Sequence, residues 1–395
     1  SKNTTGTSLT AIGQLALAEN TTANDNTAVG RLALFENTTG ASNTALGRGS
    51  MLCNTTGADN TAVGASSLDS NTTASGNTVV GVTAGAAITT GADNTALGRK
   101  ALCTNTTGGN NTSIGAYNMT SNTTGAGNVA VGIQALCSNT TASNNVAVGL
   151  NSLLANTTGT ANTALGKESL FSNTTASCNT AIGSGSAKCT TTGCQNTAVG
   201  QQALFENTTG DNNTALGRAA LLSNTTADDN TAVGHFSLYC NTTGANHTAV
   251  GVNALHSNTT SSDNTAVGRC AAFTNTTGSC LVAIGNNALR FNTTANANVA
   301  VGRDAMCATT TGANNSALGY GTLCKNTTGA DNVAMGTDAL TANTTAVANT
   351  AIGQLALNAN TTGACNTSVG ASSLDSNTTG NRNVAIGQLT LDANT

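Results

Sequence analysis

The sequence of 395 residues has no proline and no tryptophan, and only 2% of its residues are aromatic and 8% charged. A chain of this length ordinarily forms two or three globular domains, but aromatic and large aliphatic side chains are too few here to fill several compact cores. A conventional enzyme is therefore not expected. With 13 Lys and Arg, a net charge of −4 and nine Phe and Tyr, the chain also lacks the basic stripe and the stacking platform of nucleic-acid-binding proteins.

What the sequence has instead is a repeat of 17 residues that begins with Asn-Thr-Thr and runs from Asn3 to Asn394 without insertion or deletion. With this Asn counted as position 0, 23 units are complete, and only Ile88, Thr190 and Thr309 replace Asn at a unit start. Position +10 is Gly in all 23 units, +9 is always aliphatic, +14 is Leu in 17, and +6 is a second Asn in 20. This register argues against the disordered chain that the low-complexity composition otherwise permits.

Each unit contains short segments typical of β-strands, separated by residues that close corners. Thr-Ala-Val and Ala-Leu favour extended backbone, Gly and Asn tolerate positive φ, and these polar residues recur too often for a helical repeat. The sequence therefore predicts an all-β fold, a parallel β-solenoid or β-roll with 17 residues per coil and about 23 coils, as a single continuous domain over residues 1–395. Stacking at about 4.8 Å would place like residues in ladders along a rod of roughly 110 Å. The invariant Gly at +10 indicates a corner with positive φ or a close backbone approach.

The direction of the strand side chains has two interpretations. If the aliphatic residue at +9 points into the coil, +7 shares its face and +8 points outward, because side chains alternate along a strand. Position +8 is nevertheless Ala in 20 of 23 units, and +13 is mostly Ala or Ser. These small residues predict either a surface packed closely on another copy or the narrow interior of a very thin coil.

The two Asn columns also have two interpretations. Their side chains can hydrogen-bond to the same Asn one coil away, in an amide ladder that stabilises stacked strands. Alternatively, Asn-Thr-Thr matches the N-x-[ST] acceptor of N-linked glycan; both threonines remain where Asn is replaced, so Thr has a structural role or carries sugar itself. The candidate glycosylation residues are Asn3, Asn20, Asn37, Asn54, Asn71, Asn105, Asn122, Asn139, Asn156, Asn173, Asn207, Asn224, Asn241, Asn258, Asn275, Asn292, Asn326, Asn343, Asn360 and Asn377.

Charged residues form two sparse columns. Asp occupies +5 in six units that never adjoin, which keeps these like charges at least roughly 9.6 Å apart, near the screening length of salt. Arg occupies +11 in six units. We expect both columns to be solvated edges rather than calcium ligands, which would converge. The residues are Asp25, Asp59, Asp93, Asp229, Asp263 and Asp331 at +5, and Arg31, Arg48, Arg99, Arg218, Arg269 and Arg303 at +11.

The twelve cysteines and three histidines have no metal-ligand spacing. Cys307 and Cys324 share position +15 on adjacent coils, which would place their Cα atoms about 5 Å apart, and we predict a disulfide between them. Cys178, Cys189 and Cys194 surround one corner, where a second bridge would fit. The sequence predicts no metal, no cofactor other than covalent glycan, and no catalytic residue.

The segments Asn-Thr-Ala-Val-Gly at 26–30 and Asn-Val-Ala-Ile-Gly at 383–387 resemble the Ser/Asn-x-Ala-Ile-Gly coils of YadA-like trimeric autotransporter adhesin heads. Similar repeats occur in phage and viral fibre proteins, and in composition the chain also resembles glycosylated extracellular repeat filaments. The resemblance to the adhesin heads covers every unit. It implies a left-handed β-roll, assembly as a trimer, and binding to extracellular matrix or host surfaces.

The function expected from these features is structural: an extracellular filament or fibre shaft, coated by glycan at its Asn-Thr-Thr corners. An adhesin head that binds host or matrix surfaces is the alternative. An ice-binding solenoid with Thr ladders is a third, although adjacent Thr4 and Thr5 point to opposite faces of a strand.

The expected partners are copies of the chain itself, arranged laterally or end to end, with no nucleic acid and no membrane span. The expected location is extracellular or on a cell or virion surface. Because the chain begins and ends inside the repeat, we expect it to be a window of a longer fibre.

Overall fold

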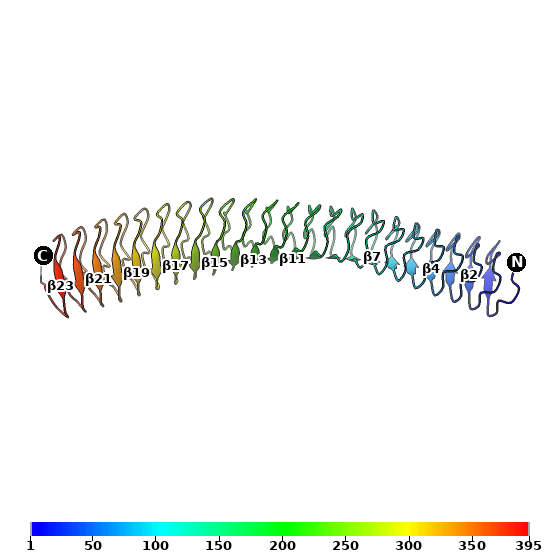
Figure 1. Ribbon diagram of the computed structural model, residues 1–395, viewed down its shortest axis with the longest axis horizontal. Helices are drawn as coiled ribbons and strands as arrows, with labels where there is room; N and C mark the ends of the chain where they lie inside the picture. The colour runs from blue at the N-terminus through cyan, green and yellow to red at the C-terminus, as the bar shows by residue number, and fades with distance from the viewer. Residues whose placement is uncertain (1, 394–395) are drawn as a thin grey trace. The chain divides into compact units, whose positions relative to one another are not determined.

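The computed structural model describes residues 2–393 of a chain that divides into two compact units, Ser1–Asn196 and Thr197–Thr395. Each unit is a parallel β-solenoid in which every coil of 17 residues contributes one short strand (Figure 1). The predicted fold class is confirmed. The single continuous domain over 1–395 stays a prediction.

All strands are three residues long and occupy positions +7 to +9 of the repeat. The strands of unit 1 are β1 (Thr10–Ile12), β2 (Thr27–Val29), β3 (Thr44–Leu46), β4 (Thr61–Val63), β5 (Thr78–Val80), β6 (Thr95–Leu97), β7 (Thr112–Ile114), β8 (Val129–Val131), β9 (Val146–Val148), β10 (Thr163–Leu165) and β11 (Thr180–Ile182). Those of unit 2 are β12 (Thr197–Val199), β13 (Thr214–Leu216), β14 (Thr231–Val233), β15 (Thr248–Val250), β16 (Thr265–Val267), β17 (Val282–Ile284), β18 (Val299–Val301), β19 (Ser316–Leu318), β20 (Val333–Met335), β21 (Thr350–Ile352), β22 (Thr367–Val369) and β23 (Val384–Ile386).

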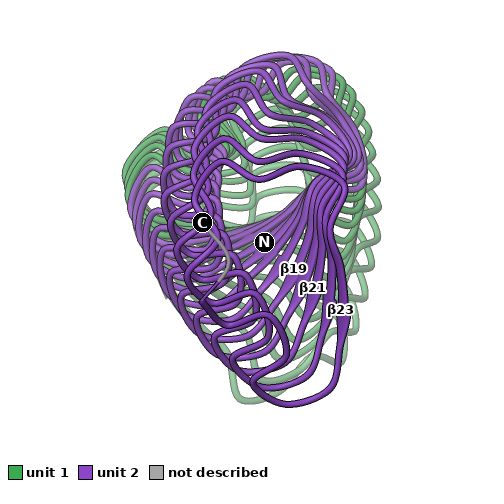
Figure 2. Cartoon of the chain, turned by 90° about the vertical axis from the view of Figure 1, so that its left-hand side faces the viewer, with its two compact units in different colours: residues 1–196 green, residues 197–395 purple. Residues whose placement is uncertain are grey.

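Neighbouring strands pair in parallel, in a register that shifts by one repeat. In unit 1, Thr27 of β2 lies opposite Thr44 of β3, and in unit 2, Thr231 of β14 lies opposite Thr248 of β15. Within unit 2 the strands β19, β21 and β23, which belong to every second coil, lie on the same side of the stack (Figure 2). Like residues are therefore stacked directly over one another, as the repeat predicts.

The core of each coil is thin and is built from small residues, one Leu and two Asn. Ala28 at +8 and Leu34 at +14 are fully buried, and so is Ala33 at +13. Position +9 instead faces outward, with Leu46 46% exposed. The interpretation in which +9 points inward and the Ala column faces another copy is therefore wrong, and the other interpretation, in which Ala fills the narrow interior of a thin coil, is confirmed. The interior of so thin a coil has room for Ala, but not for Val or Leu, opposite the Leu at +14.

The invariant Gly at +10 follows from two constraints. Gly30 has φ +136°, outside the region that L-residues ordinarily adopt, and a Cβ at this position would lie 2.5 Å from the carbonyl oxygen of Gly47 on the next coil. Its neighbour Gly47 donates its backbone N–H to Val29 at 2.8 Å. Both parts of the expectation for this glycine, the positive φ and the close approach, are confirmed.

Candidate functional site

The Asn at position 0 forms a ladder that runs through the interior of each unit. The Nδ2 of Asn37 donates to Oδ1 of Asn20 on the preceding coil at 3.1 Å and to the carbonyl of Gly40 in its own corner at 2.9 Å. Asn54 repeats the pattern, with its Nδ2 2.8 Å from Oδ1 of Asn37. One side chain thus closes a corner and joins two coils, so the predicted amide ladder is confirmed.

The second Asn column, at +6, meets the first at the same carbonyl oxygen. Asn26 donates from Nδ2 to the Gly40 carbonyl on the next coil at 2.8 Å, while its Oδ1 accepts the backbone N–H of Asn43 at 2.8 Å. The Gly40 carbonyl therefore accepts amide protons from both columns, Asn26 and Asn37. This arrangement satisfies buried polar groups that would otherwise destabilise the coil.

The position-0 ladder is interrupted where the sequence replaces Asn, and each interruption leaves buried polar atoms without a partner. The Oδ1 atoms of Asn71, Asn173 and Asn292 are buried and unpaired, and the residue one coil later in these three places is Ile88, Thr190 and Thr309. The hydroxyls of Thr190 and Thr309 are also buried and unpaired. Each bond of the ladder therefore depends on an Asn at the next coil, and the bond is lost where another residue replaces that Asn.

Burial and bonding of the candidate glycosylation residues favour the structural interpretation of this column. Apart from Asn3, which is exposed, the twenty candidates lie in the coil interior, and the Asn37 and Asn54 side chains are inaccessible to solvent. A glycan on Nδ2 would remove one of the two N–H donors that the ladder uses, and it would need space that the interior does not have. N-linked glycan stays a prediction, and within this column of candidates only Asn3 is exposed.

The two threonines that follow have different environments. The hydroxyl of Thr21 at +1 is half-buried and donates to the backbone carbonyl of Thr38 on the next coil at 2.9 Å, and the same bond recurs from Thr38 to Thr55 at 3.0 Å. Thr22 and Thr39 at +2 are exposed. The Thr column at +1 therefore has the structural role that the retained threonines indicated. The Thr column at +2 presents a row of solvent-facing hydroxyls.

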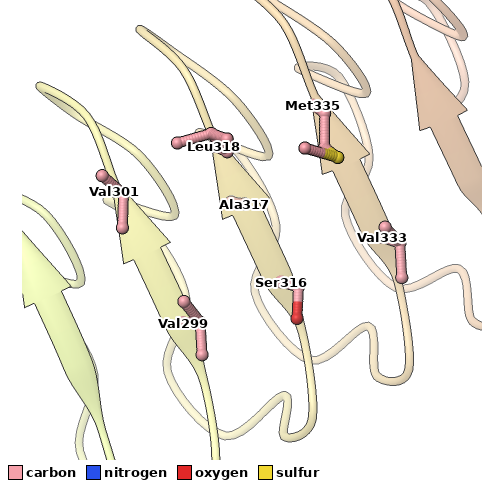
Figure 3. A pocket seen from close by; sticks show the side chains of 7 residues that line it. All are labelled: Val299, Val301, Ser316, Ala317, Leu318, Val333 and Met335. Atoms are coloured by element: carbon pink, nitrogen blue, oxygen red, sulfur yellow. The ribbon is translucent and has the colours of Figure 1, made fainter.

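The outer side of the strands, which we call the strand face, consists of the residues at +7 and +9. Leu216 is 45% exposed and Leu318 is 46% exposed, whereas the Ala between the two outward positions is buried in every strand from β2 to β21 that has Ala there. Figure 3 shows Val299, Val301 and Leu318 projecting from the same side of adjacent strands. They line a shallow hollow of about 180 Å³ beside Ser316, where a smaller side chain replaces Thr or Val.

The charged columns flank this face and are solvated, as predicted. Asp93, two residues before β6, and Arg99, two residues after it, are both exposed, and the same holds for Asp263 and Arg269 around β16. Among residues 2–393, no ion pair joins a +5 Asp to a +11 Arg. The strand face is thus bordered by an acidic edge and a basic edge that do not neutralise each other.

Cys307 and Cys324 are free thiols in this structure. These two lie at the same position of adjacent coils, as predicted, and burial raises the pKa of Cys307 to about 11, with the neighbouring Cys324 thiol and Asp304 adding to the shift. Burial likewise raises the pKa of Cys324. The disulfide between them is not formed here and stays a prediction.

His247 replaces Asn in the +6 column and takes over its hydrogen bonds. Its Nδ1 accepts the backbone N–H of Asn264 at 3.2 Å, and its Nε2 lies 2.7 Å from the Ser261 carbonyl, which requires a proton on Nε2. Burial lowers the pKa of this imidazole. His247 is therefore a neutral core residue and not a metal ligand.

One surface cluster was not singled out from the sequence. Tyr239, His256 and Phe273 occupy +15 on three successive coils; the rings of Tyr239 and His256 are stacked 5.2 Å apart, and those of His256 and Phe273 5.0 Å apart. Burial in this stack lowers the pKa of His256, which favours the neutral ring. The available signal was the run of large side chains at +15 from Phe205 onward.

The part of the chain that the structure describes contains no cluster of three or more His, Cys, Asp or Glu that could hold a metal ion, and no helix with the length and hydrophobicity to cross a membrane. Comparison of the chain with protein-family models and with curated protein sequences gives no match. The resemblance to YadA-like heads and to viral fibre repeats therefore stays a prediction.

Proposed function

We propose that the chain is the structural shaft of an extracellular filament, built from copies of itself. The observation that carries this proposal is the continuity of bonding along the stack. Within each unit, successive coils are joined by strand pairing, by the position-0 amides and by the +1 hydroxyls, as between Asn37 and Asn54 or Thr21 and Thr38. Such a solenoid gains length by adding coils without needing a new core, which suits a shaft.

The strand face has no charged residue and the coil is thin, and both features fit the role of a structural shaft. The interior is occupied by buried Ala, Leu and Asn side chains, and the hollow at Ser316 is shallow. Ligand sites in enzymes are concave and carry convergent polar groups, whereas this hollow is lined by aliphatic side chains. The strand face therefore favours side-by-side contact over capture of a small substrate.

Glycan, if the shaft is coated, would be carried by threonine at +2. The hydroxyls of Thr22 and Thr39 are exposed and make no hydrogen bond within the coil, whereas the amides of Asn20 and Asn37 are buried and bonded. An O-linked sugar at +2 would leave both ladders intact. It would also form a regular stripe along the stack, since +2 recurs once per coil.

The test uses native material. Antibody labelling in electron micrographs should place the chain along filaments, and intact mass before and after chemical release of O-glycan should show a large loss, with little change after enzymatic release of N-glycan. Absence of the chain from filaments would contradict the shaft. A mass equal to that of the bare sequence would contradict the glycan coat and leave the shaft standing.

The aromatic stack supports an adhesin as the second candidate. Tyr239, His256 and Phe273 form a partly exposed column of stacked rings in unit 2, and aromatic side chains at a surface pack on sugars or on apolar protein surfaces. Binding to glycans or matrix proteins that is lost in Tyr239→Ala and Phe273→Ala, but kept in the exposed-site control Phe291→Ala, would favour this role. An ice-binding solenoid is the third prediction, and thermal hysteresis of the purified protein would support it.

A further inference from the structure

The strand face is uncharged along its whole length. The positions +7, +8 and +9 contain only Thr, Ser, Ala, Val, Leu, Ile and Met in all 23 units. Their outward side chains are nevertheless well exposed, as for Leu216 at 45%, Ile284 at 38% and Met335 at 40%. The +9 residues form a continuous exposed aliphatic column beside a +7 column of mostly Thr, and exposed apolar surface of this extent marks an interaction site.

The two edges of the strand face carry opposite charge. The +5 column contains six Asp and a single base, Arg382, while the +11 column contains six Arg, Lys167 and no acid. The residues of both columns lie two positions outside the strand, one before it and one after it. Because the same division holds separately in unit 1 and in unit 2, the polarity across the face is a property of the repeat.

We propose that two copies of the chain pair through their strand faces, with their stacks parallel and their coils in register. This proposal rests on the proposed function in one respect: it names the lateral partner of a shaft. The pair has a twofold axis that runs along the stacking direction and lies between the two faces, which makes the interface isologous.

Charge complementarity selects the parallel arrangement. A rotation of 180° about the stacking direction exchanges the two edges, so that the acidic edge of each copy faces the basic edge of the other. A rotation of 180° about the strand direction, which makes the stacks antiparallel, instead places Asp against Asp and Arg against Arg. Like charges set opposite each other are unfavourable, so the edges favour the first arrangement and oppose the second.

The same charges favour the register. Three coils carry an acid and a base together: Asp25 with Arg31, Asp93 with Arg99, and Asp263 with Arg269. A twofold axis along the stack keeps each coil level with its own copy, so each of these coils would form two ion pairs across the interface. A shift by one coil would break all six of these pairs and bring only three others level: Asp25 with Arg48, Arg48 with Asp59, and Arg218 with Asp229.

The size of the strand face is sufficient for a pair. Three residues at about 3.3 Å and eleven or twelve coils at about 4.8 Å give each unit a face of roughly 500–600 Å². Two such faces remove at least about 1,000 Å² from water in total, which is the lower end of specific protein interfaces, and the chain has two units. Sheets pack face to face at about 10 Å, a separation at which an Asp and an extended Arg on facing edges can meet.

The first experiment measures mass. Sedimentation equilibrium of the whole 395-residue chain should give twice the 38.5 kDa of one copy. The variant Leu216→Lys, Leu318→Lys places two charges at exposed positions of the strand face and should weaken pairing at least about tenfold. The control Phe291→Lys changes a residue that is similarly exposed, at 44%, but lies outside the face, and should pair normally. Circular dichroism melting confirms that both variants are folded.

The second experiment tests orientation. Copies labelled at the amino terminus with a donor or an acceptor fluorophore should transfer energy when mixed. Reversing one edge, with Asp25, Asp59 and Asp93 all changed to Arg, should weaken pairing at low salt, and adding Arg31→Asp, Arg48→Asp and Arg99→Asp should restore it. Screening at 1 M salt should remove the difference between these variants.

Each other outcome overturns a stated part of the proposal. A monomer at high concentration, or a trimer, contradicts the twofold pair; a dimer insensitive to the lysine variant contradicts the strand face; and absence of energy transfer contradicts the parallel register. If the purified chain pairs as described but native material shows it outside filaments, the shaft fails and the pairing stands. If native filaments contain the chain but the purified protein stays monomeric, the pairing fails and the shaft stands.

Discussion

Asn suits a stacked coil because its side chain offers two N–H donors and an acceptor in one plane. In the position-0 column, one donor closes the corner at the +3 carbonyl, and the other joins the preceding coil at Oδ1, as in Asn37 with Gly40 and Asn20. Each Asn is in turn the acceptor for the following coil. The free energy of the column therefore depends on neighbours, and one replacement leaves the previous Asn without its donor, as Asn292 shows beside Thr309.

Restoring the missing amide should stabilise the solenoid locally. In Thr309→Asn the new Nδ2 can donate to the unpaired Oδ1 of Asn292, and the new Oδ1 can accept from Asn326, so we expect a gain of about 1–2 kcal/mol in the free energy of local opening. Native-state hydrogen exchange of the flanking coils measures it. Thr311→Asn, at the exposed +2 position, is the matched control and should change little. Equal protection in both variants would contradict the ladder energetics.

His247 should make the stability of unit 2 depend on pH. Burial lowers the pKa of this imidazole in the folded chain, whereas in the unfolded chain it has its ordinary value of about 6.5. Below pH 6.5 the unfolded state therefore binds the proton more readily, and stability falls as the pH falls. Protonation would also place a second N–H on Nδ1, which now accepts from Asn264.

The comparison that isolates this effect is His247→Asn, because Asn is the usual residue of the +6 column. Melting temperatures between pH 7.5 and 5 should fall less in the variant than in the parent chain. The carboxylates titrate alike in both proteins, so they cancel in the difference. A pH dependence that is the same in both would show that His247 does not titrate on unfolding.

The thiols of Cys307 and Cys324 should alkylate slowly at ordinary pH. The thiolate is the reactive form, and burial, together with the neighbouring Cys324 and Asp304, raises the pKa of Cys307 to about 11. The rate of carboxymethylation of Cys307, followed by peptide mass spectrometry, should therefore keep rising as the pH approaches 11, and at pH 8 it should be slower than at exposed Cys280. Protection from alkylation that disappears only after reduction would instead reveal the predicted Cys307–Cys324 disulfide.

At the scale of the strand, the sequence could predict position and register but not direction. The indel-free repeat places Thr27 opposite Thr44, because any other pairing would misalign every later column. The direction depends on how wide the coil is. Val29 is more hydrophobic than Ala28, so hydrophobicity alone places it inside, yet the Leu at +14 and the two Asn columns leave room at +8 only for a small side chain such as Ala.

The candidate site, like the strand, was predictable from the sequence only in part. The amide ladder is predictable because stacking puts each Asn over another, whereas the separate fates of Thr21 and Thr22 are not, since they depend on which hydroxyl lies beneath a carbonyl of the next coil. The aromatic stack of Tyr239 and His256 is visible only after the coil is closed, because the two residues are 17 positions apart in a column that is otherwise variable.

The corner at +10 should be the least tolerant element of the coil. Gly30→Ala would combine an unfavourable φ of +136° with a Cβ 2.5 Å from the Gly47 carbonyl oxygen, and we expect a loss of about 3 kcal/mol or more in the opening free energy of β2 and β3. Gly49→Ala is the control: its φ is +63° and its nearest neighbouring atom would lie 3.8 Å away, so the cost should be near 1 kcal/mol. Hydrogen exchange of β2 and β3 measures the opening free energy in both variants. If Gly30→Ala and Gly49→Ala lower it by similar amounts, the close approach of the Gly47 carbonyl is not what makes Gly30 necessary.

At the scale of the whole molecule, each coil contacts only its neighbours, so the length of the chain should matter less than its register. Deleting residues 207–223 removes one complete coil of 17 residues from unit 2 and brings Glu206 next to Asn224, which keeps every column intact. The far-ultraviolet spectrum per residue and the melting temperature should then change little. This deletion is the control for a much smaller change.

Inserting a single Ala between Ala232 and Val233 of β14 should be worse than deleting the whole coil. The added residue takes the outward position and turns Val233 into an interior that admits Ala, and it shifts the backbone groups that pair with β15. We expect lost hydrogen-exchange protection in β13 to β15 and a lower melting temperature, although composition is almost unchanged. If the insertion is tolerated as well as the deletion, the strand is not what holds the coils in register, and the ladders of Asn would have to do so alone.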